Sequence, residues 1–189
     1  MKNFLLVFTT FFLTNIAFAQ IEQLVKNGEE KSGALLFSER AGSLIVSSYY
    51  SLGSVGKLGM LYKPVVFEVI LFEDVISNEK EACMRLTVTS ENTLYYGYLD
   101  ADEIDACIKS IKFIRENTLL SKPRIETKCE YKSRAGVRFG ARYQSSNWRI
   151  YIQSNVLNNS IVRFDDINEI LSLENVFIKA KGKIDELIN

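Results

Sequence analysis

The chain has 189 residues, a formal net charge of zero and no histidine. The lack of histidine excludes Ser-His-Asp and Cys-His catalytic groups and every histidine-ligated metal site. With three cysteines the chain is not a disulfide-rich scaffold, so apolar burial must hold its core together.

The first nineteen residues have the order of zones found in a secretory signal peptide. Lys2 supplies a positive start, residues 4–18 are mostly apolar, and Ala17 and Ala19 are small residues where a signal peptidase cleaves. An uncleaved anchor helix is the alternative, but a bilayer crossing needs about twenty apolar residues. We therefore expect cleavage after Ala19 and a mature domain, residues 20–189, in the periplasm or outside the cell.

After a polar lead-in over residues 21–31, for which a helix is one interpretation, strand patterns and turns extend from Gly33 to Leu99. Residues 65–72 form a near-continuous apolar run, and apolar and polar residues alternate from Met84 to Thr89, as in a half-buried strand. The glycines between Leu52 and Tyr62 predict a loop or the end of a hairpin.

A helical pattern begins at Asp102, where apolar residues recur in one helical stripe at positions 104, 107, 108 and 111. Asp100 or Asp102 is suited to cap this helix, which should end before Pro123. The same acidic cluster does not match the pattern of a calcium-binding loop. Ile104 stands in a ligand position, and Asp105 stands where the pattern needs glycine.

The same order of elements returns after Ser121. Alternating residues predict strands over 125–132, 137–143 and 148–152, followed by a short strand that ends at Phe164. A second helix is predicted to open at Asp165 and to run almost to the C-terminus, with an apolar side made of Phe177, Ile178, Ile184 and Ile188.

The two successive units, residues 33–120 and 121–189, predict a single α+β domain with an internal pseudo-repeat. Each unit has antiparallel strands with one apolar face, followed by a helix with one apolar stripe. Because neither surface is stable in water, the helices should pack on the sheets.

Two units of four antiparallel strands and a helix resemble the Whirly family of single-strand DNA-binding proteins. The resemblance covers about Gly33 to Leu187 as topology and includes no diagnostic motif, so it assigns no functional residue. It implies binding of nucleic acid inside cells or organelles, whereas the signal peptide predicts export.

Cys83, Cys107 and Cys129 allow at most one internal disulfide and a free thiol. The candidate pair is Cys107 with Cys129, because both fall on apolar faces of their predicted elements. The alternative is that all three are small buried hydrophobic residues.

Basic residues concentrate on the polar face of the second set of strands. If Val137, Phe139 and Ala141 point inward, the arginines between them point outward. The candidate anion- or ligand-binding face comprises Lys132, Arg134, Arg138, Arg142, Arg149 and Tyr151. Such a face is suited to contact phosphates and to stack bases or sugars. The alternative is a solvated face that keeps the sheet soluble.

No catalytic residue, metal site or cofactor is predicted. The glycine-rich segment 53–59 is too short for a phosphate-binding Walker loop, and Leu58 replaces its Ser or Thr. We expect a non-catalytic exported binding or interaction module with a protein or polyanionic partner. A single-stranded nucleic-acid-binding or polyanion-binding protein of Whirly-like type is the second candidate. An enzyme that uses carboxylates, lysine or tyrosine is the third.

Overall fold

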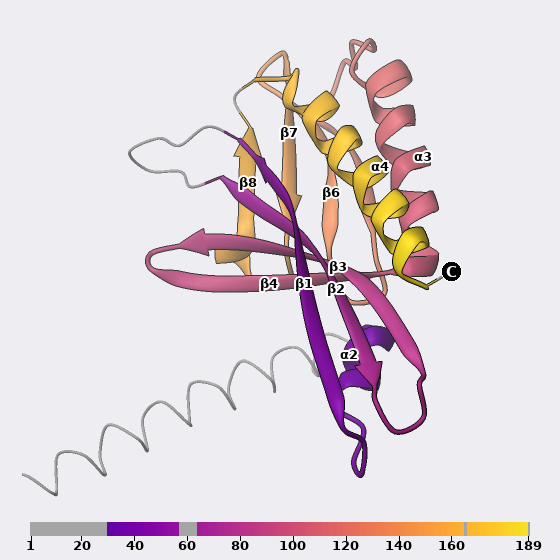
Figure 1. Ribbon diagram of the computed structural model, residues 1–189. Coiled ribbons are helices and arrows are strands. Elements are labelled where there is room, and N and C mark those ends of the chain that lie inside the picture. Colours follow the sequence, from indigo (N-terminus) through magenta and orange to yellow (C-terminus); the bar gives the residue numbers. More distant parts are fainter. Residues whose placement is uncertain (1–29, 57–63, 165, 189) are drawn as a thin grey trace, which may run out of the picture. The chain divides into compact units, whose positions relative to one another are not determined.

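The computed structural model describes residues 30–56, 64–164 and 166–188, and from Lys31 onward they form one unit. The predicted signal peptide, nearly all of the predicted lead-in and the end of the glycine-rich segment lie outside the described residues. The unit holds two four-stranded antiparallel sheets together with helices, which confirms the predicted α+β class (Figure 1). No helix among the described residues is long and apolar enough to cross a bilayer.

Each half of the unit runs through four strands and ends in a helix, so the predicted repeat in the order of elements is confirmed. The elements of the first half are α2 (Gly33–Ser38), β1 (Ile45–Val55), β2 (Val65–Asp74), β3 (Lys80–Ser90), β4 (Thr93–Asp100), η1 (Ala101–Glu103), α3 (Ile104–Phe113) and η2 (Ile114–Thr118). Those of the second half are β5 (Thr127–Lys132), β6 (Arg138–Gln144), β7 (Asn147–Gln153), η3 (Asn158–Ser160), β8 (Ile161–Phe164) and α4 (Glu169–Ile188).

Helix α2 stands where the sequence predicted the first strands. The carboxylate of Asp100, at the end of β4, accepts hydrogen bonds from the amides of Gly33 at 2.8 Å and Ala34 at 3.2 Å. It also accepts one from the hydroxyl of Ser32 at 2.5 Å. The first turn of α2 is therefore held by a residue from a distant part of the chain, which no local pattern reveals. Its buried side chains pack on one face of the first sheet, against Ile70, Phe72 and Cys83.

Strand β1 continues into the segment predicted as a loop from Leu52 onward. Its pairing with β2 shifts register between Ser51 and Gly53, and Gly53 has a φ of 103°. This bulge absorbs Leu52 as one extra residue, and the pairing with β2 resumes at Gly53. The glycine therefore marks an irregularity inside a strand rather than the end of one.

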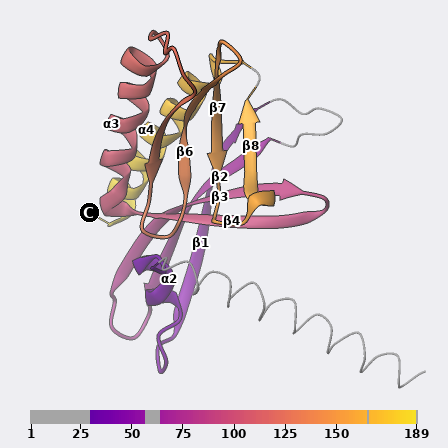
Figure 2. The same ribbon diagram turned by 180° about the vertical axis from the view of Figure 1, so that it is seen from behind.

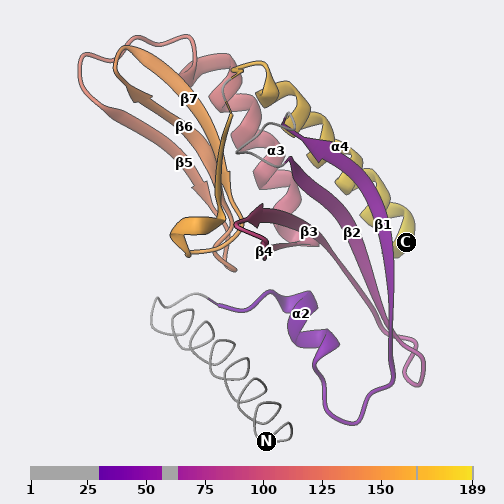
Figure 3. The same ribbon diagram turned by 90° about the vertical axis from the view of Figure 1, so that its left-hand side faces the viewer.

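The two long helices pack against each other, and each lies against the sheet of the other half. Helix α4 contacts β1, β2 and β3, whereas η2, which continues α3, contacts β6. Figure 3 shows α3 beside the second sheet and α4 beside β1 and β2. This exchange unites the two halves in a shared core.

The aromatic ring of Phe177 on α4 lies at the centre of this core. Its centroid is 5.3 Å from that of Phe139 on β6 and 6.5 Å from that of Phe67 on β2. Phe177 thus contacts both sheets. Ile178 and Ile188, predicted on the apolar side of the helix, are instead 50% and 42% exposed. The buried stripe consists of Ile170, Leu173, Val176, Phe177, Ala180 and Ile184.

The disulfide predicted between Cys107 and Cys129 is not formed in the structure. All three cysteines are free; Cys83 and Cys107 are buried and Cys129 is half-buried. Burial raises the pKa of Cys83 and that of Cys107 to about 12. Because disulfide exchange requires a thiolate, these two thiols are unreactive near neutral pH.

Candidate functional site

The outer face of the second sheet, which is turned away from the helices, carries a concentration of positive charge. In the register of the sheet, Lys128, Arg142 and Arg149 lie opposite one another across β5, β6 and β7, and Arg163 on β8 lies opposite Tyr151. Residues that lie opposite in a sheet share a face. We call the basic face the surface formed by Lys128, Lys132, Arg138, Arg142, Arg149, Tyr151 and Arg163. Figure 2 shows β6, β7 and β8 of this sheet.

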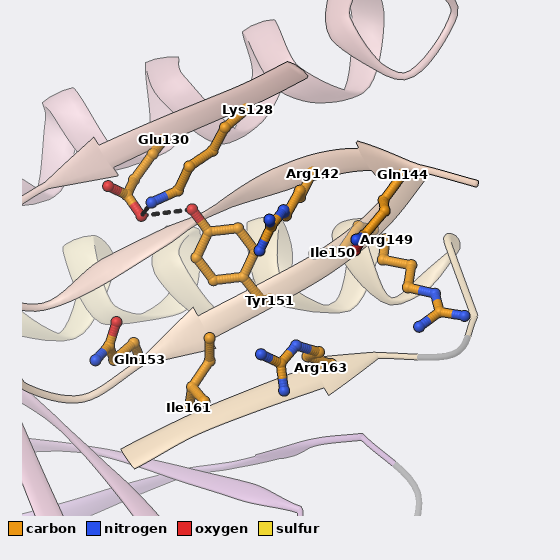
Figure 4. Close-up of a pocket in the computed structure, with 10 residues that line it drawn as sticks. All are labelled: Lys128, Glu130, Arg142, Gln144, Arg149, Ile150, Tyr151, Gln153, Ile161 and Arg163. Carbon is orange, nitrogen blue, oxygen red and sulfur yellow. Dashed lines mark hydrogen bonds and ion pairs between the residues drawn. The ribbon is translucent and has the colours of Figure 1, made fainter. Parts of the chain in front are cut away.

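A hollow of about 400 Å³ lies on the basic face (Figure 4). Arg142, Arg149 and Tyr151 line it, as three of the six residues predicted for a ligand-binding face. Lys132 on β5 and Arg138 on β6 lie opposite each other in the register of the sheet, at the other end of these strands and outside the hollow. The structure therefore brings these five predicted residues onto one face and three of them into one hollow.

The ring of Tyr151 forms the floor of the hollow. Its hydroxyl donates a hydrogen bond to the carboxylate of Glu130 on β5 at 2.5 Å. Gly140 lies between these two residues in the register, and because glycine has no side chain the ring reaches across β6 (Figure 4). The tyrosine is only 5% exposed, and burial, reinforced by the bond to Glu130, raises its pKa far above the ordinary value. The Tyr151 side chain is therefore uncharged at neutral pH, and its hydrogen bond to Glu130 holds the ring at the base of the hollow.

Glu130 is the acidic residue that lines the hollow. Burial disfavours its ionisation, but hydrogen bonds from Lys128 and Tyr151 outweigh this effect, and the pKa of Glu130 lies below its ordinary value. The carboxylate is therefore ionised at neutral pH. Because the amine of Lys128 lies 2.5 Å from it, the two charges largely cancel each other.

Three arginines give the hollow its net positive charge. Arg142 is partly compensated by Glu126, whose carboxylate accepts a hydrogen bond from its Nε at 2.6 Å. Within residues 30–56, 64–164 and 166–188, no carboxylate pairs with Arg149 or Arg163. Arg142 and Arg149 also lie directly opposite across β6 and β7, where like charges destabilise a sheet. A bound anion would relieve this repulsion.

Arg134, predicted on the same face, has a structural role. It lies in the turn between β5 and β6, and its guanidinium donates to Asp102 at 2.9 Å and to Asp100 at 3.1 Å. Its backbone amide donates to Glu103 at 2.9 Å. These bonds join the second sheet to the acidic cluster at the start of α3, so the structure does not bring Arg134 into the hollow.

A second, wider hollow of about 760 Å³ lies at the end of the β6–β7 hairpin. Tyr143 and Trp148 line it, with ring centroids 5.2 Å apart, and the indole of Trp148 donates to the carbonyl of Ser121 at 2.9 Å. Arg149 lines both hollows. A ligand held by Arg149 therefore has an aromatic surface close to its charged group.

The outer face of the first sheet offers no comparable charge. Arg85 lies over the rings of Tyr49 and Tyr96, about 5.1 Å from each centroid, and donates to Glu68 at 2.7 Å. The pKa of Arg85 is raised by this pairing against the opposing effect of burial. Because Glu68 compensates its charge, this face attracts anions less than the basic face does.

Lys128 and Arg163 both line the hollow but are not among the residues predicted for the ligand-binding face. Lys128 has the same parity on its strand as Lys132, and Arg163 stands between Val162 and Phe164, which are both buried. The same rule of alternation that identified Arg138 and Arg142 would have placed both residues on the polar face.

No protein-family model, curated protein or solved structure matches the chain.

Proposed function

We propose that this protein is a non-catalytic binding module whose basic face takes a polyanion. The observation that carries the proposal is the pair Arg149 and Arg163, which line one hollow and have no carboxylate partner within the described ranges. Guanidinium groups match carboxylates, sulfates and phosphates with paired hydrogen bonds. The hollow thus has donors suited to these anionic groups.

A ligand with several anionic groups fits better than one with a single charge. Lys128, Arg142 and Arg149 form a row across three neighbouring strands. Because neighbouring strands are about 4.8 Å apart, the row spans about 10 Å. An acidic polymer would place successive charges along such a row.

Single-stranded nucleic acid is the second candidate, favoured by the order of elements, four antiparallel strands and a helix in each half. Its binding to open sheets relies on bases that stack on exposed aromatic rings. Tyr151 is buried and hydrogen-bonded to Glu130, which limits stacking at the centre of the basic face. The charged groups of an acidic polysaccharide or a polyphosphate are recognised by guanidinium groups, which require no such ring.

Replacing Arg149 and Arg163 together with alanine is expected to weaken binding of heparin and of polyphosphate at least about tenfold. One hydrogen bond to a charged group contributes about 1.5–3 kcal/mol, and the variant removes two arginines. Fluorescence anisotropy or calorimetry in low and moderate salt measures the effect, and the wild-type affinity should fall steeply as salt rises.

Two matched variants control for charge. Lys112→Ala with Lys179→Ala removes the same charge from exposed positions on α3 and α4 and should leave binding nearly unchanged. Glu130→Gln removes the acid from the hollow and should strengthen binding. Equal losses in both double variants would contradict a specific site, and a preference for oligothymidylate over heparin would move nucleic acid to first place.

We also propose that the working form begins at Gln20 and acts outside the cytoplasm. The charged start, the apolar run and the small residues at Ala17 and Ala19 support this proposal. In the native host, mass spectrometry of the mature protein is expected to find Gln20 at the N-terminus. Recovery of the chain with Met1 from the cytosol would contradict export and would favour the nucleic-acid candidate.

A further inference from the structure

The four edges of the two sheets are not protected equally. An open edge strand presents unpaired amides and carbonyls and can pair with another chain, so proteins usually guard such strands with charges, short length or a covering segment. Edge strand β5 carries Lys128, Glu130 and Lys132. Edge strand β8 has four residues and carries Arg163. These two edges are therefore guarded.

Edge strand β4 is covered in its middle. A Cβ added at Gly97 would lie 2.2 Å from the carbonyl oxygen of Ser154, so the segment after β7 packs closely on one face of β4. The side-chain amide of Asn155 donates to the carbonyl of Tyr96 at 3.4 Å. One backbone carbonyl of β4 is therefore already bonded, and the segment after β7 lies beside the middle of this strand.

Strand β1 has none of these protections. It has 11 residues, and residues 41–56 contain no Asp, Glu, Lys, Arg or Pro. From Ile45 to Ser54 no residue is buried, and Val46 and Tyr49 are 48% and 56% exposed. Within the described ranges β1 pairs with β2 alone, and it lies at the border of the first sheet in Figure 1. This edge is long, uncharged and partly apolar.

We propose that β1 pairs with β1 of a second copy of this chain, antiparallel and across a two-fold axis, so that the two first sheets form one eight-stranded sheet. A two-fold axis places each residue of β1 beside a residue of the same strand, and like charges in such positions would repel. Residues 41–56 carry no charge, so β1 can pair with its own copy without repulsion between like charges. The charged edge strands β5 and β8 cannot.

The side chains of β1 favour the pairing. Ser47 and Ser51 lie two residues on either side of Tyr49, so a two-fold axis at Tyr49 pairs each serine with the other and places the two tyrosines side by side. Cross-strand aromatic pairs and serine pairs stabilise antiparallel strands. The proposal does not depend on the polyanion site, because the basic face lies on the other sheet.

Sedimentation equilibrium of the purified protein between about 1 and 100 µM is expected to show a dimer. The double variant Ser47→Lys, Ser51→Lys should raise the dimer dissociation constant at least about tenfold, because it places lysines opposite each other in the pair. The control Thr93→Lys, Leu94→Lys adds the same charge to exposed residues of β4 and should leave the dimer intact.

A cysteine scan from Ser47 to Ser51 in a Cys129→Ser background tests the register without added charge. Residues that face each other across antiparallel strands have Cα atoms about 4.5–5.5 Å apart, within the range of a disulfide. A single position, or two neighbouring ones, should form a covalent dimer on oxidation. A monomeric wild-type protein at 100 µM, a dimer that the two lysines do not weaken, or a scan without a cross-link would overturn the proposal.

Discussion

Replacing Phe177 with alanine is expected to lower the free energy of unfolding by about 3–5 kcal/mol. The ring is fully buried and contacts Phe67 of the first sheet and Phe139 of the second. Its loss leaves a cavity lined by side chains of both sheets. Urea unfolding monitored by circular dichroism measures the change as a lower midpoint.

The next residue on the helix is the matched control. Ile178 is 50% exposed, so Ile178→Ala should cost less than about 1 kcal/mol. Comparable losses for the two variants would show that Phe177 is not the centre of the shared core. A second transition in the Phe177→Ala curve would indicate that the two halves unfold separately once this contact is lost.

Replacing Gly97 with alanine is expected to destabilise the protein by about 3 kcal/mol or to prevent its folding. The added Cβ would lie 2.2 Å from the carbonyl oxygen of Ser154 and 2.8 Å from a methyl carbon of Val137. Because the closer atom belongs to the backbone, the whole segment after β7 would have to move, and overpacking of this kind commonly costs about 1–3 kcal/mol or more. Thermal unfolding and the yield of soluble protein measure the effect.

Gly182→Ala is the opposite case. Gly182 lies inside α4, and beyond the adjoining backbone of its own helix no described atom lies within 4 Å of a Cβ added there. Alanine is a better helix former than glycine by about 1 kcal/mol, so this variant should raise stability. If the two substitutions changed stability in the same direction, the close approach of β4 to the second sheet would not be the reason for the glycine at position 97.

Local patterns predicted most of the secondary structure because strand and helix periods are properties of consecutive residues. The alternation at Arg138, Arg142 and Arg149 placed these side chains on one polar face, as the register shows. The stripe from Ile104 to Ile111 predicted α3. The second helix, predicted to open at Asp165, begins instead at Glu169, and Ile167 is 41% exposed before it.

The sequence by itself determined the α+β class, the repeated order of strands and helix, and the polar face on which the basic residues gather. The tertiary structure alone decided that Arg134 pairs with Asp100 and Asp102, that the carboxylate of Asp100 holds the start of α2, and that each long helix covers the other half's sheet. The physical reason is that these features depend on contacts between residues far apart in the chain. Alternation and helical spacing describe only neighbours in sequence.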